Sequence, residues 1–126
     1  MSDGGLREET VLVVDDEPMV RDIVARVLET VFARVLVASG GDAAIAHLND
    51  QRVDLLVTDL KMPGVSGLDV ARAALARGVR TRVIAISGYV TPADEDALAA
   101  LGVDLLRKPF DVDALLTRVE RLLDAP

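Results

Sequence analysis

Five polar side chains that could do chemistry stand at the ends of four apolar runs in this sequence. Each run is rich in Val, Leu or Ile, which is typical of a buried β-strand, and each stops at a polar residue. The five residues are Asp15, Asp16, Asp59, Ser87 and Lys108. Because the carboxyl ends of parallel strands meet at one edge of a sheet, we expect these side chains to lie in one pocket.

The three carboxylates of this set predict a cation site. Carboxylates that converge in one pocket repel each other and raise one another's pKa unless a cation is present. The sequence has no Cys and a single His, so the available ligands are oxygens, which favour Mg²⁺ or Mn²⁺ over zinc. A carboxylate held beside Mg²⁺ can act as a nucleophile toward a phosphoryl group and form an aspartyl phosphate.

Asp59 is the candidate nucleophile because it lies within the most informative stretch of the chain, VDLLVTDLKMPGVSG, where an apolar run ends. Phosphoryl transfer needs mainly positioning and neutralisation of charge on the phosphoryl oxygens. The ammonium of Lys108 is a compact charge that can contact one of those oxygens. The hydroxyl of Ser87 can donate to another, and its movement toward the phosphoryl group could shift a loop and so report the modification.

Alternating strands and helices are predicted to position these residues. Strands are predicted over residues 10–14, 34–38, 53–59, 82–86 and 103–106. A helix follows each strand, and the first begins at Pro18, with Arg21 on its polar face. Capping patterns indicate the other helix starts, and they are Ser39 with Asp42, Ser66 with Asp69, Thr91 with Asp94, and Asp111. Gly78 and Gly102 are predicted to end the third and fourth helices.

Five strands that alternate with five helices over short loops predict a single α/β domain. Parallel pairing with right-handed crossovers places helices on both faces of the sheet. The expected architecture is flavodoxin-like, a doubly wound (βα)5 sheet of five parallel strands in the order 2-1-3-4-5. Residues 1–9 are expected to form a flexible N-terminal tail, and residues 10–124 the domain itself.

Composition argues against several classes of function. With 14 basic and 21 acidic residues the net charge is -7, which repels a nucleic-acid backbone and argues against direct DNA binding. Aromatic residues make up 2% of the chain, which leaves little material for stacking on bases or a flavin. No apolar run is long enough to span a bilayer and the polar N-terminus is unlike a secretory signal, so a cytoplasmic location is the default expectation.

Four motifs in the chain resemble those of the receiver domains of two-component response regulators. They are VLVVDDEP, LLVTDLKMPGVSG, AISG and RKPF, in the family's order and spacing, and the likeness covers residues 10–123. The resemblance implies that the chain is a phosphoacceptor in a phosphorelay and not an enzyme that turns over a separate substrate. In that role Asp59 takes a phosphoryl group from the histidine of a histidine kinase or phosphotransfer protein, and the domain switches between inactive and active surfaces.

The resemblance also implies a metal site and a partner surface. It implies that Asp16, Asp59 and the backbone carbonyl of Lys61 coordinate Mg²⁺, for which Mn²⁺ is a possible substitute, while Asp15 acts mostly through water. In the family the side chain two places after the acceptor, here Lys61, tunes dephosphorylation. The fourth helix, fifth strand and fifth helix form the family's usual output face, so they are the expected place for a homodimer.

At the sensing residues the chain keeps the family's chemistry and departs from it at one place. Lys108 and Ser87 take the phosphate-sensing roles, and the bond between Lys108 and Pro109 is expected to be cis. Receivers often carry Tyr or Phe three residues before the lysine as a rotating switch, whereas this chain has Leu105. The aromatic coupling is therefore absent, or is partly taken over by Tyr89, which occupies the family's second position for tuning dephosphorylation.

Three other functions are alternatives for a chain of this fold class. A phosphatase of the haloacid dehalogenase type needs a second Asp two residues after the nucleophile, where this chain has Lys61. A flavin-binding electron carrier needs a Ser/Thr-rich loop after the first strand, where this chain reads DDEP. The alternative that remains is a degenerate receiver, which binds partners without being phosphorylated. A stand-alone domain and a piece of a longer regulator or hybrid kinase both fit the sequence.

Overall fold

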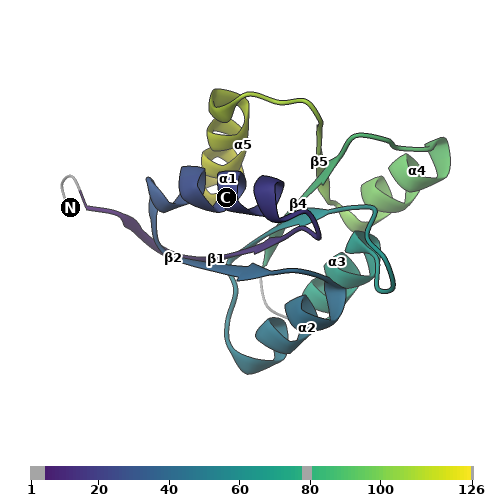
Figure 1. Ribbon diagram of the computed structural model, residues 1–126, viewed down its shortest axis with the longest axis horizontal. Helices are drawn as coiled ribbons and strands as arrows, with labels where there is room; N and C mark the ends of the chain where they lie inside the picture. Colours follow the sequence, from purple (N-terminus) through teal and green to yellow (C-terminus); the bar gives the residue numbers. More distant parts are fainter. Residues whose placement is uncertain (1–4, 78–80, 126) are drawn as a thin grey trace.

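The computed structural model of this chain describes residues 5–77 and 81–125, which form a parallel sheet with helices on both faces (Figure 1). The strands are β1 (Arg7–Val14), β2 (Phe32–Ala38), β3 (Leu55–Asp59), β4 (Arg82–Ser87) and β5 (Asp104–Arg107). They lie in the order β2-β1-β3-β4-β5, and all neighbours are parallel. The predicted α/β class and strand order are therefore confirmed.

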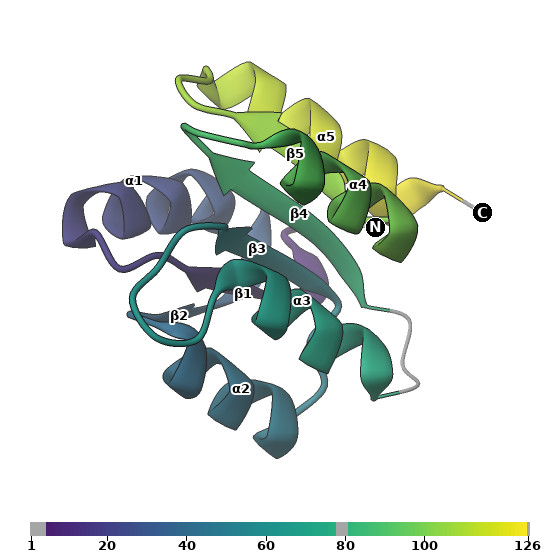
Figure 2. The ribbon, with the colours of Figure 1, turned by 90° about the vertical axis from the view of Figure 1, so that its right-hand side faces the viewer.

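Each strand leads into a helix that covers one face of the sheet. The helices are α1 (Pro18–Glu29), α2 (Gly41–Asp50), α3 (Gly67–Ala76), α4 (Pro92–Leu101) and α5 (Val112–Asp124). Figure 2 shows α1 and α5 on one side of the sheet and α2 and α3 on the other, and the buried Leu98 of α4 belongs to the α2 and α3 side. Within the described ranges, no helix combines the length and apolar character that a membrane crossing needs.

Successive residues of the central strands contribute to two different cores. Leu12 and Val14 pack on the side of α2 and α3, whereas Val11 and Val13 pack on the side of α1 and α5. All four are at most 1% exposed, and burial of each such side chain contributes about 1.5–3 kcal/mol. A sheet that is covered on both faces explains the uninterrupted apolar runs of the sequence. The reactive polar residues are correspondingly found where the strands end.

Side-chain caps begin three of the helices at the predicted places. The capping boxes of Ser66 with Asp69 and of Thr91 with Asp94 are both formed, and Asp111 accepts from the amide three residues on. These caps satisfy backbone N–H groups that have no partner within the helix. Two of them begin the helices that follow β3 and β4, so they also fix the loops that border the carboxyl edge of the sheet.

The predicted cap of α2 is wrong. Gly40 is the N-cap residue, and its carbonyl accepts the first helical bond from the amide of Ala44 at 3.1 Å. Ser39 therefore lies one residue too early to cap the helix, which starts with no side-chain cap bond. At the other helix ends, Gly102 adopts the left-handed conformation that the prediction requires, with φ of 71°, and Gly78 lies outside the described residues.

β1 begins at Arg7, so the prediction of a flexible tail over residues 1–9 is wrong for its last three residues. The guanidinium of Arg7 bonds Glu9 at 2.9 Å and Asp124 at 2.8 Å, and it lies 5.9 Å from the ring centroid of Phe32. These contacts join the first residue of β1 to α5 and β2, and β1 extends beyond its apolar run. The other strands begin and end within two residues of their predicted bounds.

Gly67, the first residue of α3, lies directly against the end of β3. A Cβ atom on Gly67 would lie 2.0 Å from the carbonyl oxygen of Asp59 and 2.9 Å from the Cα of Leu60. The amide of Gly67 also donates to the carbonyl of Leu60 at 3.0 Å. Because these neighbours are backbone atoms, they cannot rotate away from a side chain. Only a residue without a side chain therefore allows α3 to lie this close to the end of β3 that carries Asp59.

Substitution Gly67→Ala is expected to lower the free energy of unfolding by about 2 kcal/mol or more, because the new methyl group would push α3 away from β3. Urea denaturation followed by circular dichroism measures this change. Gly40→Ala is the matched control, since a Cβ atom there meets nothing within 4 Å. Its cost at an N-cap position is expected to stay below about 1 kcal/mol. Equal losses for the two variants would contradict the close packing at Gly67.

Candidate functional site

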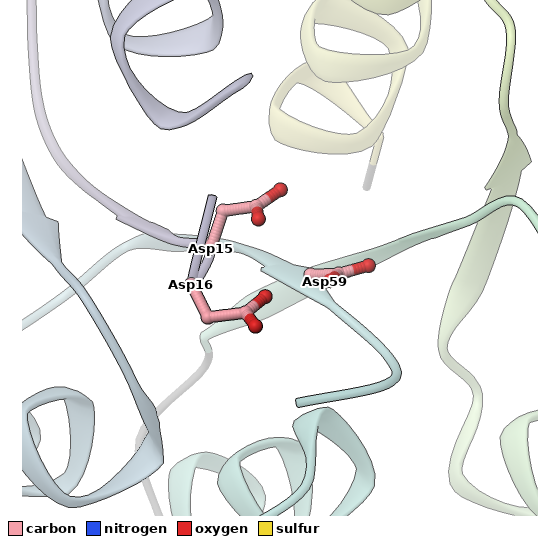
Figure 3. Close-up of side chains that lie close together, drawn as sticks. All are labelled: Asp15, Asp16 and Asp59. Atoms are coloured by element: carbon pink, nitrogen blue, oxygen red, sulfur yellow. The ribbon is translucent and has the colours of Figure 1, made fainter. Parts of the chain in front are cut away.

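Three carboxylates meet at the carboxyl edge of the sheet, as Figure 3 shows for Asp15, Asp16 and Asp59. β1 and β3 are parallel neighbours in which Val14 lies opposite Thr58, so the next residues, Asp15 and Asp59, lie side by side. One carboxylate oxygen from each of the three acids lies within 4.8 Å of those of the other two. The structure thus brings Asp59 next to two acids that precede it in the sequence by 43 and 44 residues.

Lys108 enters the same pocket from the loop after β5. Its Nζ atom lies 3.5 Å from Asp59 Oδ1 and 3.7 Å from Asp15 Oδ2. Its backbone amide donates to the carbonyl of Ser87 at 2.9 Å, and its peptide bond to Pro109 is cis, as expected. The ammonium therefore lies between the two buried acids, where it offsets part of their negative charge.

The charges of this pocket do not balance. Asp59 is 7% exposed, and burial is the largest of the effects that raise its pKa above the ordinary value for aspartate. The nearby charge of Asp15 raises the pKa further, and Asp16 adds a smaller contribution. Lys108 lowers the pKa through its charge and its hydrogen bond, but it offsets only part of the increase. Ionisation of Asp59 is therefore less favourable in the folded protein than in the unfolded chain.

The raised pKa of Asp59 makes its negative charge a cost to stability. In the unfolded chain the carboxyl group keeps an ordinary pKa, so a rising pH ionises it first in the unfolded state. Stability from this group is complete below the unfolded pKa, and it is lost as the pH rises to the folded pKa and above. A cation bound only by the folded protein reverses this loss, because it removes the repulsion and adds its own binding free energy.

Backbone amides fix two of the three acids and leave several oxygens free. The amide of Glu17 donates to Asp15 Oδ1 at 2.9 Å, and the amide of Leu60 donates to Asp59 Oδ1 at 3.0 Å. Within residues 5–77 and 81–125, neither the carboxylate of Asp16 nor Asp59 Oδ2 accepts a hydrogen bond. These oxygens remain available to a ligand.

The donor set fits a hard divalent cation. Asp15, Asp16 and Asp59 offer carboxylate oxygens at mutual distances that one ion can bridge. Burial first, and then the charge of Asp15, raise the pKa of Asp59, and a cation would offset the second of these effects. The backbone carbonyl of Lys61 is two residues beyond Asp59 in the loop after β3. Oxygen ligands without sulfur or imidazole are those that Mg²⁺ and Mn²⁺ prefer.

Ser87 is buried at the end of β4, beside β3, and its hydroxyl bonds within its own loop. β4 pairs with β3 so that Ile86 lies opposite Asp59, which places Ser87 at the adjoining strand end. Ser87 is 2% exposed. Its hydroxyl donates to the carbonyl of Tyr89 at 2.8 Å and accepts from the amide of Tyr89 at 3.3 Å. In this arrangement the hydroxyl stabilises the loop after β4.

The other sequence-predicted residues lie around the pocket in different roles. Lys61 directs its ammonium to Asp94 of α4 at 2.8 Å, and this contact, with the Thr91 amide, lowers the pKa of Asp94 to about 2. Tyr89 is 70% exposed, whereas Leu105 is partly buried against the core on the side of α2 and α3.

Arg21 is a member of the site that sequence reasoning missed. Helical periodicity places Arg21 on the polar face of α1, but its Nη1 atom donates to the backbone carbonyl of Asp15 at 2.9 Å. The guanidinium thus points back toward the turn that carries the acid pair. The sequence does place Arg21 five residues after Asp16, on the helix that begins just beyond the acid pair. Side chains of a helix lean toward its N-terminus, so a long side chain at this position can reach the acid pair.

The family model described as response regulator receiver domain matches residues 11–120 of this chain. The chain is 35% identical over 117 residues to the probable transcriptional regulatory protein TcrX of Mycobacterium tuberculosis, covering 90% of this chain and 49% of that protein. It is 33% identical over 116 residues to the CAI-1 autoinducer sensor kinase/phosphatase CqsS of Vibrio cholerae, covering 89% and 17%. The chain thus spans half or less of the length of these curated relatives.

Solved structures resemble this one over nearly the whole chain. The chemotaxis protein CheY4 of Vibrio cholerae superposes with a TM-score of 0.84 at 27% identity, and the match covers 93% of this chain and 100% of that one. A response regulator receiver protein of Pseudomonas putida gives a TM-score of 0.80 at 32% identity, with coverage of 93% and 99%. The likeness in sequence and the likeness in structure therefore extend over the same domain.

Proposed function

Because this chain belongs to the family of response regulator receiver domains, we propose that Asp59 accepts a phosphoryl group from a phosphohistidine of a partner protein. The observation that carries this proposal is the position of Asp59, which is buried between the acid pair that follows β1 and the ammonium of Lys108. A pocket of this composition suits phosphoryl transfer to Asp59, a reaction that depends mainly on positioning and on neutralisation of charge.

Asp59 supplies the attacking oxygen. Its Oδ1 atom is held by the amide of Leu60 and by Lys108, whereas Oδ2 accepts no hydrogen bond within the described ranges. Oδ2 attacks the phosphorus atom, and the bond between phosphorus and the imidazole nitrogen of the donor breaks. The electron pair of that bond stays on the imidazole, which takes up a proton. The domain itself carries the product, so it acts as a signalling domain and promotes only its own modification.

Asp59 and the acids beside it would hold the cation that assists this transfer. Asp15, Asp16, Asp59 and the backbone carbonyl of Lys61 are the groups that would bind Mg²⁺, or Mn²⁺ in its place. When bound, the ion supplies positive charge that offsets the charge of the carboxylates and of the phosphoryl oxygens. The ammonium of Lys108 then contacts one phosphoryl oxygen from the side of β5.

Ser87 links the phosphoryl group to the loop after β4. Its hydroxyl leaves the carbonyl of Tyr89 and donates to a phosphoryl oxygen, which draws that loop toward the pocket. The same loop leads to Thr91, the residue that caps α4. Lys61 joins the acceptor loop to α4 through Asp94, so both loops that border the pocket connect to this helix. A change at Asp59 therefore has a short route to the surface of α4.

Exposed apolar side chains beside the pocket give the phosphodonor a place to dock. Met19 and Ile23 on α1 are 77% and 58% exposed, and Val112 at the start of α5 is 48% exposed. A cavity of about 140 Å³ lies between these two helices and is lined by apolar side chains, among them Ile23 and Phe110. The donor is a histidine kinase or a histidine phosphotransfer domain, and its apolar surface covers these residues while its histidine meets Asp59.

The output surface of this domain comprises α4, β5 and α5. Arg107 of β5 pairs with Glu95 of α4, and Arg118 of α5 bonds Asp104 of β5 at 3.1 Å. Charged groups that pair across these elements can exchange partners with a second copy or with an effector. The arrangement supports homodimer formation or partner binding through this face once α4 moves.

A degenerate receiver that works without phosphorylation is the less favoured alternative. Such a domain needs no acceptor geometry, whereas this chain keeps three acids within 4.8 Å of one another and a lysine 3.5 Å from Asp59. Each charge in the pocket adds repulsion or desolvation cost to the folded state. A domain that only binds partners would gain nothing from that cost.

Incubation with Mg²⁺ and acetyl phosphate is expected to add one phosphoryl group to the protein, because Asp59 Oδ2 is free to attack. Intact-mass spectrometry measures the addition, and Asp59→Asn is expected to abolish it. Lys108→Ala is expected to reduce the rate by about 100-fold, since one oxygen of the transferred group loses its cationic contact.

The control for this experiment is Arg72→Ala, which removes an exposed cationic side chain of α3 that pairs with Asp69 at 3.6 Å. This variant is expected to accept the phosphoryl group at a rate within about threefold of the unmodified chain, because an exposed ion pair contributes little. A chain that gains no mass, or an Asp59→Asn variant that gains as much, would contradict the proposal and favour the degenerate receiver.

Substitution Ile23→Asp is expected to slow transfer from a phosphorylated histidine phosphotransfer protein by about tenfold, because it places a charge in the docking patch. Labelling by acetyl phosphate should stay unchanged, since a small donor needs no such contact. Leu6→Asp is the control, as Leu6 is 49% exposed and precedes β1 at the opposite edge of the sheet. If Leu6→Asp slowed the transfer as much as Ile23→Asp, docking on α1 would be wrong.

A further inference from the structure

The turn between β1 and α1 is held at three points around Asp15. The amide of Asp15 donates to the carbonyl of Ala38 at 3.2 Å, and Asp15 Oδ1 accepts from the amide of Glu17 at 2.9 Å. The third point is the carbonyl of Asp15, which accepts from Arg21 Nη1 at 2.9 Å. Asp15 follows the last residue of β1, so its carbonyl lies beyond the strand and Arg21 supplies its contact.

Asp16 depends on this turn for its direction. Its carboxylate accepts no hydrogen bond within the described residues, yet one of its oxygens lies within 4.8 Å of oxygens of Asp15 and Asp59. Like charges at this distance repel, and a solvent-accessible side chain is able to turn outward into water. The inward direction of Asp16 therefore has to come from its backbone, which lies between the two peptide groups that are held.

The position and chemistry of Arg21 allow it to hold the backbone of Asp15 and Asp16 in place. Its own amide donates to the carbonyl of Glu17 at 3.0 Å, so its Cα position is fixed by the first turn of α1. Its side chain is partly buried and extends back along the helix to the carbonyl of Asp15. A guanidinium donates charge-assisted hydrogen bonds in a fixed planar geometry, which makes it more restrictive than an ammonium.

We propose that Arg21 is a positioning residue for the divalent cation, because its bond to the Asp15 carbonyl keeps the carboxylate of Asp16 directed at Asp59. This inference rests on the proposed function, since it assigns a role within the same cation site. Arg21 touches none of the carboxylates that would bind the ion, so it acts only through the turn.

A positioning role and a purely electrostatic role of Arg21 predict opposite changes in cation affinity when Arg21 is removed. If Arg21 acted only as a nearby positive charge, its removal would strengthen cation binding, by about twofold at an ionic strength near 0.1 M. If Arg21 holds the turn, its removal weakens binding, and loss of a residue that orients a ligand lowers metal affinity by about tenfold or more. The sign of the change separates the two roles.

The test is a titration of the unphosphorylated protein with Mg²⁺, followed by nuclear magnetic resonance of the amides of Asp16 and Leu60. Arg21→Gln is expected to raise the dissociation constant about tenfold, and Arg21→Lys to give an intermediate value because one donor remains. Arg26→Gln is the matched control, since Arg26 is an exposed arginine on the same helix. Its removal deletes an equal charge and is expected to leave the constant unchanged or up to about twofold lower.

A double variant excludes a general loss of structure. In an Asp16→Asn background the Arg21→Gln change is expected to lose most of its effect on the affinity, because the carboxylate that it directs is gone. If urea titrations without metal show that Arg21→Gln is unfolded, the Mg²⁺ dissociation constants of Arg21→Lys and Arg26→Gln are compared instead. If Arg21→Gln binds Mg²⁺ as tightly as the unmodified chain or more tightly, the proposed role of Arg21 is wrong. The proposed function then still stands, provided that the unmodified chain binds Mg²⁺ and accepts phosphate. Absence of Mg²⁺ binding in the unmodified chain overturns the proposed function together with it.

Discussion

The repulsion among three carboxylates at one edge of the sheet is the constraint on which the rest of this structure depends. Asp15, Asp16 and Asp59 converge there, and the single ammonium of Lys108 offsets only part of their charge. Such a cluster persists because the strands that carry it are among the most buried parts of the chain. The hydrophobic free energy of those strands exceeds the local electrostatic cost, so the fold keeps the acids together until a ligand neutralises them.

Strand register turns that hydrophobic free energy into a precise arrangement of the pocket. β1 and β3 are buried on both faces, and their pairing sets Val11 opposite Leu55 and Val14 opposite Thr58. That register places Asp15 beside Asp59 at the point where both strands end. Gly67 then allows α3 to contact the backbone of Asp59, and Ser87 and Lys108 follow from the two neighbouring strands.

The sequence predicted the parts of this structure that depend on local patterns. Apolar runs located all five strands, and two capping boxes, including that of Ser66, were placed correctly because a cap involves residues three apart. The extension of β1 to Arg7 was missed because its partners lie on β2 and α5, distant in sequence. The bonds of Arg21 to the acid turn and of Lys61 to Asp94 were missed for a similar reason, since helical periodicity describes a face and not the contacts of a long side chain.

The central claim is tested most directly by urea unfolding of the unmodified chain and of Asp59→Asn, with EDTA or with excess Mg²⁺. The account predicts that Asp59→Asn is the more stable protein in EDTA at pH 7, and that its advantage shrinks as the pH falls toward the ordinary aspartate pKa of about 3.9. Mg²⁺ at about 100 times its dissociation constant should stabilise the unmodified chain by about 2.7 kcal/mol and the variant by far less. A variant that is no more stable in EDTA, or that gains equally from Mg²⁺, would contradict the account.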